Sequence, residues 1–211
     1  MKHPAKYTKT LMPVFVSMLE PLNSTAKILD PFAGTGRIHE LPFDTYGIEI
    51  EKEWADMNPK TICGDSTKMH WFQDSFFDAV CTSPTYGNRM ADHFKASDTS
   101  KRNTYMHTLG RELTQNNSGK MHWGDDYKNL HESVYAECFR VMKSGGLFIL
   151  NMKNHIRNGI EIDVNKWHIE CLMKLGFDYV SIASVPVRGN GFGKNGKVRT
   201  PYEYVTKLEK K

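Results

Sequence analysis

The chain has 211 residues, of which 39% are hydrophobic and 25% charged, and its formal net charge at pH 7 is +4. These values are typical of one soluble globular domain that buries a core without disulfide bonds. No apolar run has the length of a membrane span, no signal-peptide centre lies near the N-terminus, and the four cysteines and nine histidines show no metal-binding spacing. We therefore expect no membrane partner, no metal, and free thiols in a reducing compartment.

Strand-like and helix-like apolar patterns alternate along the chain. We predict helices over Leu11–Leu22, Tyr127–Met142 and Val164–Leu175, with a helical or irregular piece ending at Met57. We predict strands over Lys27–Leu29, Thr45–Glu51, Thr61–Asp65, Phe76–Thr82, Leu147–Met152, Tyr179–Val187 and Arg199–Leu208. Residues 87–126 are polar without a clear period, which predicts a long functional loop. The alternation predicts an α/β fold, with a mostly parallel seven-stranded sheet, helices on both faces and a C-terminal antiparallel hairpin.

A glycine turn follows the first predicted strand. Ile28 and Leu29 lead into Asp30-Pro31-Phe32-Ala33-Gly34-Thr35-Gly36, and we expect a helix to begin near Arg37. Such a turn lets the backbone approach a ligand closely and points N–H groups outward. The sequence therefore predicts a ligand pocket at this turn, beyond the carboxyl end of the strand.

Two acids follow the next two predicted strands. Glu49 ends the second strand, where a carboxylate can accept hydrogen bonds from both hydroxyls of a ribose. Asp65 follows Gly64 after the third strand, where it can accept from the amino group of an adenine. The first turn lacks the third glycine that a dinucleotide pyrophosphate needs. A smaller cofactor with a single nucleoside is the better prediction.

The fourth strand ends in Thr82-Ser83-Pro84-Thr85-Tyr86. Proline fixes the chain as it leaves the strand, so that the preceding carbonyl groups are exposed. Ser83 supplies a hydroxyl and Tyr86 a ring at the same edge of the sheet. A planar base with an amino group could stack on this ring and donate hydrogen bonds to Ser83 and to a backbone carbonyl.

At these motifs the chain resembles class I S-adenosylmethionine-dependent methyltransferases, specifically the amino-methyltransferases of DNA. DPFAGTG is similar to their cofactor loop, GIEIE to their ribose-binding acid, GD to their adenine-contacting acid, and TSPTY to their Ser/Asp/Asn-Pro-Pro-Tyr catalytic motif. HPAKYTKTLM is similar to the segment that closes over the methionine end of the cofactor. HTLGRELTQNNSGKMHWGDDY and NMKNHIR resemble small phage-borne members, and the resemblance covers roughly residues 3–187.

This resemblance implies one Rossmann-like class I methyltransferase domain over residues 1–211 that binds S-adenosylmethionine. The implied cofactor-binding residues are Thr8, Asp30, Pro31, Phe32, Gly34, Gly36, Glu49, Ile50 and Asp65. The implied catalytic residues are Ser83, Pro84 and Tyr86. The implied reaction methylates an exocyclic amino group of a base flipped out of DNA. Serine at the first motif position favours the 4-amino group of cytosine over the 6-amino group of adenine.

Three regions are candidates for contact with DNA. The 87–126 loop, which contains Arg89, is a candidate target-reading lid, because no separate target-recognition domain is expected. Lys153 and Asn154 follow the fifth strand beside the catalytic residues. Arg188 and Lys194 belong to a segment from Val185 to Lys211 that contains seven basic and two acidic residues. Such a basic end suits a polyanion.

Two alternatives stay open. One is an RNA or protein-amide methyltransferase of the same fold, because a fold does not determine its substrate. The other is a catalytically inactive nucleic-acid-binding relative, because Thr85 stands where the family has a second proline. The DNA substrate implies the cytoplasm of a bacterial or phage-infected cell, and the sequence leaves the oligomeric state open.

Overall fold

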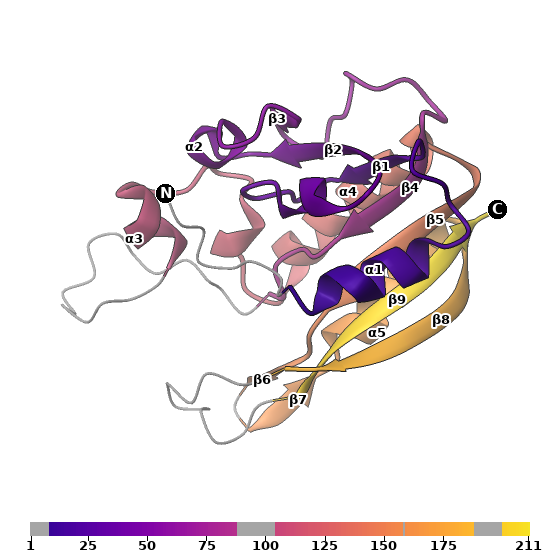
Figure 1. The fold of residues 1–211 in the computed structure, drawn as a ribbon. Helices are drawn as coiled ribbons and strands as arrows, with labels where there is room; N and C mark the ends of the chain where they lie inside the picture. Colours follow the sequence, from indigo (N-terminus) through magenta and orange to yellow (C-terminus); the bar gives the residue numbers. More distant parts are fainter. Residues whose placement is uncertain (1–8, 88–103, 158, 188–199) are drawn as a thin grey trace.

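The computed structural model describes residues 9–87, 104–157, 159–187 and 200–211. Their main sheet has seven strands in the order β3-β2-β1-β4-β5-β9-β8 (Figure 1). These strands are β1 (Lys27–Asp30), β2 (Asp44–Glu49), β3 (Thr61–Cys63), β4 (Phe77–Thr82), β5 (Met142–Met152), β8 (Phe177–Pro186) and β9 (Tyr202–Lys210). The α-helices are α1 (Leu11–Leu19), α2 (Lys52–Ala55), α3 (Tyr105–Leu109), α4 (Asp125–Val141) and α5 (Val164–Leu175). Short 3-10 helices are η1 (Arg37–Glu40) and η2 (Ser118–Lys120), and β6 (His155–Arg157) pairs with β7 (Ile160–Ile162).

Strand direction determines which residues meet at the ends of the sheet. The strands from β3 to β5 run parallel, whereas β9 runs antiparallel to both β5 and β8. The carboxyl ends of the parallel strands therefore share one edge, and β9 begins at that same edge, where Tyr204 pairs with Met152. Ligands of such sheets bind beyond this edge. The start of β9 is thus placed beside the site although it lies far along the chain.

Helices cover both faces of the sheet. In Figure 1, α1 lies on one face, and α4 and α5 lie on the other. Leu29 belongs to the core cluster that includes α4 and α5, whereas its neighbour Ile28 packs in the cluster with α1. Buried strands of this kind are apolar on both faces, which is why their sequences are nearly continuous apolar runs.

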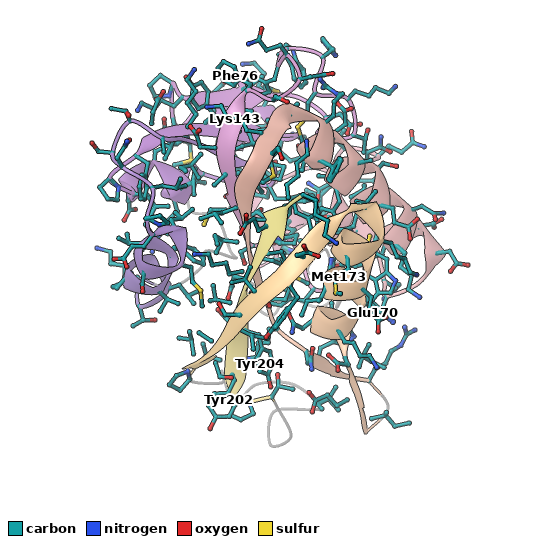
Figure 2. All side chains as sticks on the ribbon, turned by 90° about the vertical axis from the view of Figure 1, so that its right-hand side faces the viewer. Phe76, Lys143, Glu170, Met173, Tyr202 and Tyr204 are labelled. Carbon is teal, nitrogen blue, oxygen red and sulfur yellow. The ribbon has the colours of Figure 1, made fainter. Side chains whose placement is uncertain are left out.

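Figure 2 shows the two ends of the strands of the main sheet. Phe76 and Lys143 lie at one end, beside the starts of β4 and β5, and Tyr202 and Tyr204 lie toward the other, at the start of β9. The end with Tyr202 and Tyr204 is the carboxyl edge of the parallel strands.

The predicted α/β fold class is confirmed, and each predicted strand and helix has a counterpart. The helix over Val164–Leu175 has the predicted bounds, because the Asp163 side chain accepts a hydrogen bond from Lys166 N and Gly176 ends the helix with a left-handed backbone. The first helix ends at Leu19 rather than Leu22, since Glu20, which precedes Pro21, is extended. The single domain over residues 1–211 stays a prediction.

Other bounds differ because tertiary pairing overrides local sequence. β5 begins at Met142 rather than Leu147, and a register shift opposite β4 accommodates the Ser-Gly-Gly stretch. The β6–β7 hairpin was not predicted. The described part of the 87–126 region contains the short elements α3 and η2 and the start of α4, and its role as a target-reading lid stays a prediction. None of the described helices is long and apolar enough to span a bilayer.

Candidate active site

A cavity of about 360 Å³ lies beyond the carboxyl ends of the parallel strands. The predicted site residues that line it are Pro31, Phe32, Gly34, Glu49, Ile50, Asp65, Ser83, Pro84 and Tyr86. Asp30 and Gly36 were also predicted for the site, but they are not among the lining residues. The fold therefore brings the predicted cofactor and catalytic motifs to one cavity.

Asp30 is fully buried beneath the glycine turn. Its Oδ1 accepts hydrogen bonds from Phe32 N at 2.9 Å and from the Thr82 hydroxyl at 2.6 Å. Its Oδ2 has no hydrogen-bond partner among the described residues. Burial raises the pKa of Asp30 to about 6, although both hydrogen bonds act in the opposite direction. Asp30 therefore joins the end of β1 to the end of β4, and with it the two loops of the site.

The turn requires glycine at Gly36. Its φ is +79°, a left-handed backbone that side chains disfavour. A Cβ there would also lie 2.8 Å from His39 Cδ2 and 2.9 Å from Asn58 Cβ. The helix expected near Arg37 is only the short η1 turn, so this site depends on the turn rather than on a long helix.

Glu49 contacts the same turn from the end of β2. Its Oε2 accepts a hydrogen bond from Gly34 N at 2.9 Å, and its Oε1 accepts one from Glu51 N at 2.8 Å. Burial raises the pKa of Glu49 to about 7, assisted by the nearby charges of Glu51 and Asp30. A carboxylate has about four lone-pair positions, so Glu49 keeps acceptor capacity for a ligand in the cavity.

Asp65 lines the cavity just after the end of β3. Its Oδ1 accepts hydrogen bonds from the N–H and hydroxyl of Thr67, at 2.9 and 2.8 Å, and its Oδ2 accepts from Asn116 Nδ2 at 2.8 Å. Burial raises the pKa of Asp65, but these hydrogen bonds outweigh burial and lower it overall. Asp65 is therefore a charged hydrogen-bond acceptor at ordinary pH. Through Asn116 it also holds residues 104 to 124, which are called the 104–124 segment below.

Sequence reasoning missed Glu51, which anchors the 104–124 segment. This fully buried carboxylate accepts hydrogen bonds from Thr114 N and Asn117 Nδ2, both at 2.8 Å, and forms an ion pair with Arg111 at 2.7 Å. As a result the segment forms one wall of the cavity, to which Tyr105, Asn116, Asn117 and Ser118 contribute. The only sequence signal was a second acid in GIEIE, and a local pattern could not assign it to partners 60 to 66 residues away.

Ser83 belongs to a polar cluster with Tyr86 of the same loop and with side chains from β5 and β9. Asn151, at the end of β5, donates from Nδ2 to Ser83 Oγ at 3.0 Å and to Glu203 Oε2 at 3.2 Å. The Tyr86 hydroxyl lies 3.4 Å from both Ser83 Oγ and Asn151 Nδ2. Burial raises the pKa of Tyr86, so its hydroxyl stays protonated. Glu203 also lines the cavity, and sequence reasoning did not single it out.

The backbone of the predicted catalytic motif is held by hydrogen bonds of Thr85. The Thr85 hydroxyl donates to Ser118 Oγ at 2.9 Å, and the Thr85 carbonyl accepts from the Tyr127 hydroxyl. His168 Nε2 lies 2.9 Å from the Tyr127 hydroxyl, and its Nδ1 lies 2.7 Å from that of Tyr135. Burial lowers the pKa of His168, which keeps the ring neutral. Thr85 therefore has hydrogen-bond partners where the family has a second proline.

The predicted DNA-contacting residues are placed differently from one another. Asn154 does not line the cavity: its side chain donates to Glu161 Oε1 at 2.9 Å and accepts from Asn165 N at 3.1 Å, so it fixes the β6–β7 hairpin to α5. Lys153 is half-buried between β5 and that hairpin. Thr8, Arg89, Arg188 and Lys194 lie outside the described residues. Within the described ranges, no group of three or more His, Cys, Asp or Glu side chains could hold a metal ion.

No protein-family model matches the chain, and no curated protein is similar to it in sequence. Solved structures do match. A SAM-dependent methyltransferase from Methanosarcina mazei is 13% identical with a TM-score of 0.60, over 94% of this chain and 97% of that one. Geranyl diphosphate C-methyltransferase from Streptomyces coelicolor, solved with S-adenosylhomocysteine, is 9% identical with a TM-score of 0.59, over 96% of this chain and 79% of that one.

The cyclase SpnF is also similar, with 12% identity and a TM-score of 0.56 over 100% of this chain and 85% of that one. Its activity shows that this architecture does not determine the reaction. The agreement covers 94–100% of this chain and 79–97% of the three matching chains. This protein has the Rossmann-like methyltransferase fold.

Proposed function

We propose that this protein binds S-adenosylmethionine in the 360 Å³ cavity and methylates an exocyclic amino group of a base in DNA. The observation that carries the proposal is the convergence of Gly34, Glu49, Asp65 and Ser83 on one cavity from four strand ends. The volume lies within the range of about 300–1,000 Å³ that is usual for small-ligand sites. The matching solved structures include methyltransferases bound to this cofactor or its demethylated product.

The residues of the cavity fit the cofactor chemically. Glu49 would accept from the ribose hydroxyls and Asp65 from the adenine amino group, while the Gly34–Gly36 turn leaves room for the backbone to approach the ligand. Bound there, the cofactor supplies an activated methyl group. The protein's task is then to hold and orient an amino nitrogen, which is a positioning role rather than covalent catalysis.

Ser83 and Tyr86 would perform that positioning. The Ser83 hydroxyl would accept a hydrogen bond from the target amino group and favour tetrahedral geometry at its nitrogen. The Tyr86 ring would stack on a flipped base, since a base inside the duplex cannot reach the cavity. Serine in this position supports the 4-amino group of cytosine over the 6-amino group of adenine. The proposal places the reaction in the cytoplasm of a bacterial or phage-infected cell.

The experiment uses purified protein, cofactor with a labelled methyl group, and separate DNA, tRNA and protein pools. We expect label in DNA, and sequencing of plasmid co-expressed with the protein should locate the modified base. Ser83→Ala should lower the turnover rate more than it weakens DNA binding, because its hydrogen bond strengthens during the reaction. Ser144→Ala is the matched control, since Ser144 is exposed and lies in β5 next to Lys143, at the opposite end of the sheet from the cavity (Figure 2).

Label in tRNA or protein instead would support the alternative methyltransferases. Cofactor binding with no transfer to any pool would support the inactive nucleic-acid-binding relative. A Ser83→Ala protein that methylates DNA at the full rate would show that the acceptor of the amino hydrogen lies elsewhere.

A further inference from the structure

Glu203 places a carboxylate in the cavity from the far end of the sequence. It lies in β9 between Tyr202 and Tyr204, which Figure 2 shows near the end of the sheet that carries the site. Asn151 pairs with Val205 across the β5–β9 ladder. Residues directly opposite share a face, and so do residues two apart on a strand, so Glu203 is the diagonal neighbour of Asn151 on one face.

Asn151 shows what this arrangement can bind. Its side-chain NH₂ group donates to Ser83 Oγ at 3.0 Å and to Glu203 Oε2 at 3.2 Å, and it lies 3.4 Å from the Tyr86 hydroxyl. Asn151 is fully buried, and its Oδ1 has no hydrogen-bond partner among the described residues. The oxygens of Ser83 and Glu203 therefore lie together around one planar amide NH₂, which has the same donor geometry as the amino group of a nucleobase.

We propose that Glu203 is a catalytic residue: its carboxylate accepts one hydrogen of the target amino group beside Ser83 and receives the proton released by methyl transfer. This inference rests on the proposed methylation of an amino group. In the balanced step, the lone pair of the amino nitrogen forms the bond to the methyl carbon, and the carbon–sulfur bond breaks with its electrons staying on sulfur. The nitrogen is then cationic, and loss of one proton to Glu203 restores neutral methylated amine.

The surroundings suit Glu203 to this role. Burial raises the pKa of Glu203, while the hydrogen bond from Asn151 and the charge of Lys153 act in the opposite direction. The hydroxyl of Tyr86, which stays protonated, also faces it. A carboxylate with a raised pKa is a stronger base than a free one, and general bases work best with a pKa near the operating pH. The rate should therefore rise with pH through the pKa of Glu203.

The test measures single-turnover methylation of cytosine-containing DNA between pH 5 and pH 8.5, together with calorimetric cofactor binding. Glu203→Gln keeps the shape and one acceptor oxygen but cannot take the proton. We expect at least about a 100-fold loss of rate, disappearance of the rise with pH, and unchanged cofactor affinity. Formate should partly restore the rate of Glu203→Ala. Glu209→Gln, an exposed position on the same strand, is the matched control and should match wild type.

Three results would overturn the inference. Glu203→Gln at the wild-type rate would remove Glu203 from the reaction and leave the proposed function intact. A slow Glu203→Gln protein that keeps the wild-type pH profile would limit Glu203 to holding Asn151. If wild-type protein binds the cofactor but methylates no amino-bearing base, the proposed function itself fails, and the role of Glu203 fails with it.

Discussion

At the scale of single residues, the site concentrates carboxyl groups that a stable core would avoid. Asp30 and Glu49 are both buried near the glycine turn, and their pKa values are raised to about 6 and about 7. Each accepts hydrogen bonds from backbone N–H groups of the loops around the cavity, so each helps to fix the geometry of those loops. The charge of each carboxylate is poorly solvated because it is buried. Perturbed carboxyl groups of this kind gather at functional sites, which agrees with the cavity beside them.

Glu49→Gln should weaken cofactor binding by about 1–3 kcal/mol. A glutamine has one acceptor oxygen, so its NH₂ group would face either Gly34 N or Glu51 N, and an acceptor for the ribose would be lost. Calorimetry measures the effect, and Glu40→Gln is the control because Glu40 is exposed on η1. Equal affinities for a folded Glu49→Gln protein and wild type would exclude this acid from the cofactor site.

We also expect Glu49→Gln to change how the free energy of unfolding depends on pH. A carboxyl whose folded pKa is raised from 4.5 to about 7 binds more protons in the folded state, so its favourable contribution is lost as pH rises between those values. Buried neutral histidines such as His131, whose pKa burial lowers to about 4, act in the opposite direction. The difference between variant and wild type isolates Glu49. Without cofactor, Glu49→Gln should gain stability relative to wild type from pH 4.5 to pH 7; a difference independent of pH would contradict the raised pKa.

At the scale of elements, the strands and long helices were predictable because their apolar patterns are local. The 104–124 segment was not, because its position depends on Glu51, Asp65 and other partners far away in the sequence. The polar composition of the segment is plain from the sequence, but composition does not show which carboxylate the segment contacts. The same holds for Glu203, which reaches the cavity only because β9 lies next to β5 and runs antiparallel to it. A list of predicted strands does not show which strands are neighbours in the sheet.

Glu51→Ala should release the 104–124 segment. The buried carboxylate accepts hydrogen bonds from Thr114 and Asn117 and pairs with Arg111, so its removal should cost about 3 kcal/mol of unfolding free energy and weaken cofactor binding. Glu53→Ala is a matched control, because Glu53 pairs with the same Arg111 at the surface and such pairs contribute only about 0–1 kcal/mol. Hydrogen exchange of residues 111–117 should accelerate in Glu51→Ala alone. Equal exchange in both variants would show that the segment is held by other contacts.

At the scale of the whole molecule, the direction of β9 separates the basic C-terminal residues into two groups. β9 starts at the site edge and ends at the opposite edge. There Lys210 donates to the carbonyls of Phe139 and Met142, and Lys211 pairs with Asp178. These lysines are therefore tied to the scaffold far from the cavity. Arg188, Lys194, Lys197 and Arg199 fall between the end of β8 and the start of β9, outside the described residues.

This division predicts which charges would govern affinity for the proposed DNA substrate. Replacing Arg188, Lys194 and Lys197 together with glutamine should reduce the slope of log affinity against log salt by up to about three units, since each lost phosphate contact removes about one. Replacing Lys210 and Lys211 should leave the slope unchanged, because those side chains are engaged at the far edge. Fluorescence anisotropy with a labelled duplex at several salt concentrations measures both. If the triple variant keeps the wild-type slope, DNA does not contact this segment; if the double variant loses slope, the duplex extends to the opposite edge of the sheet.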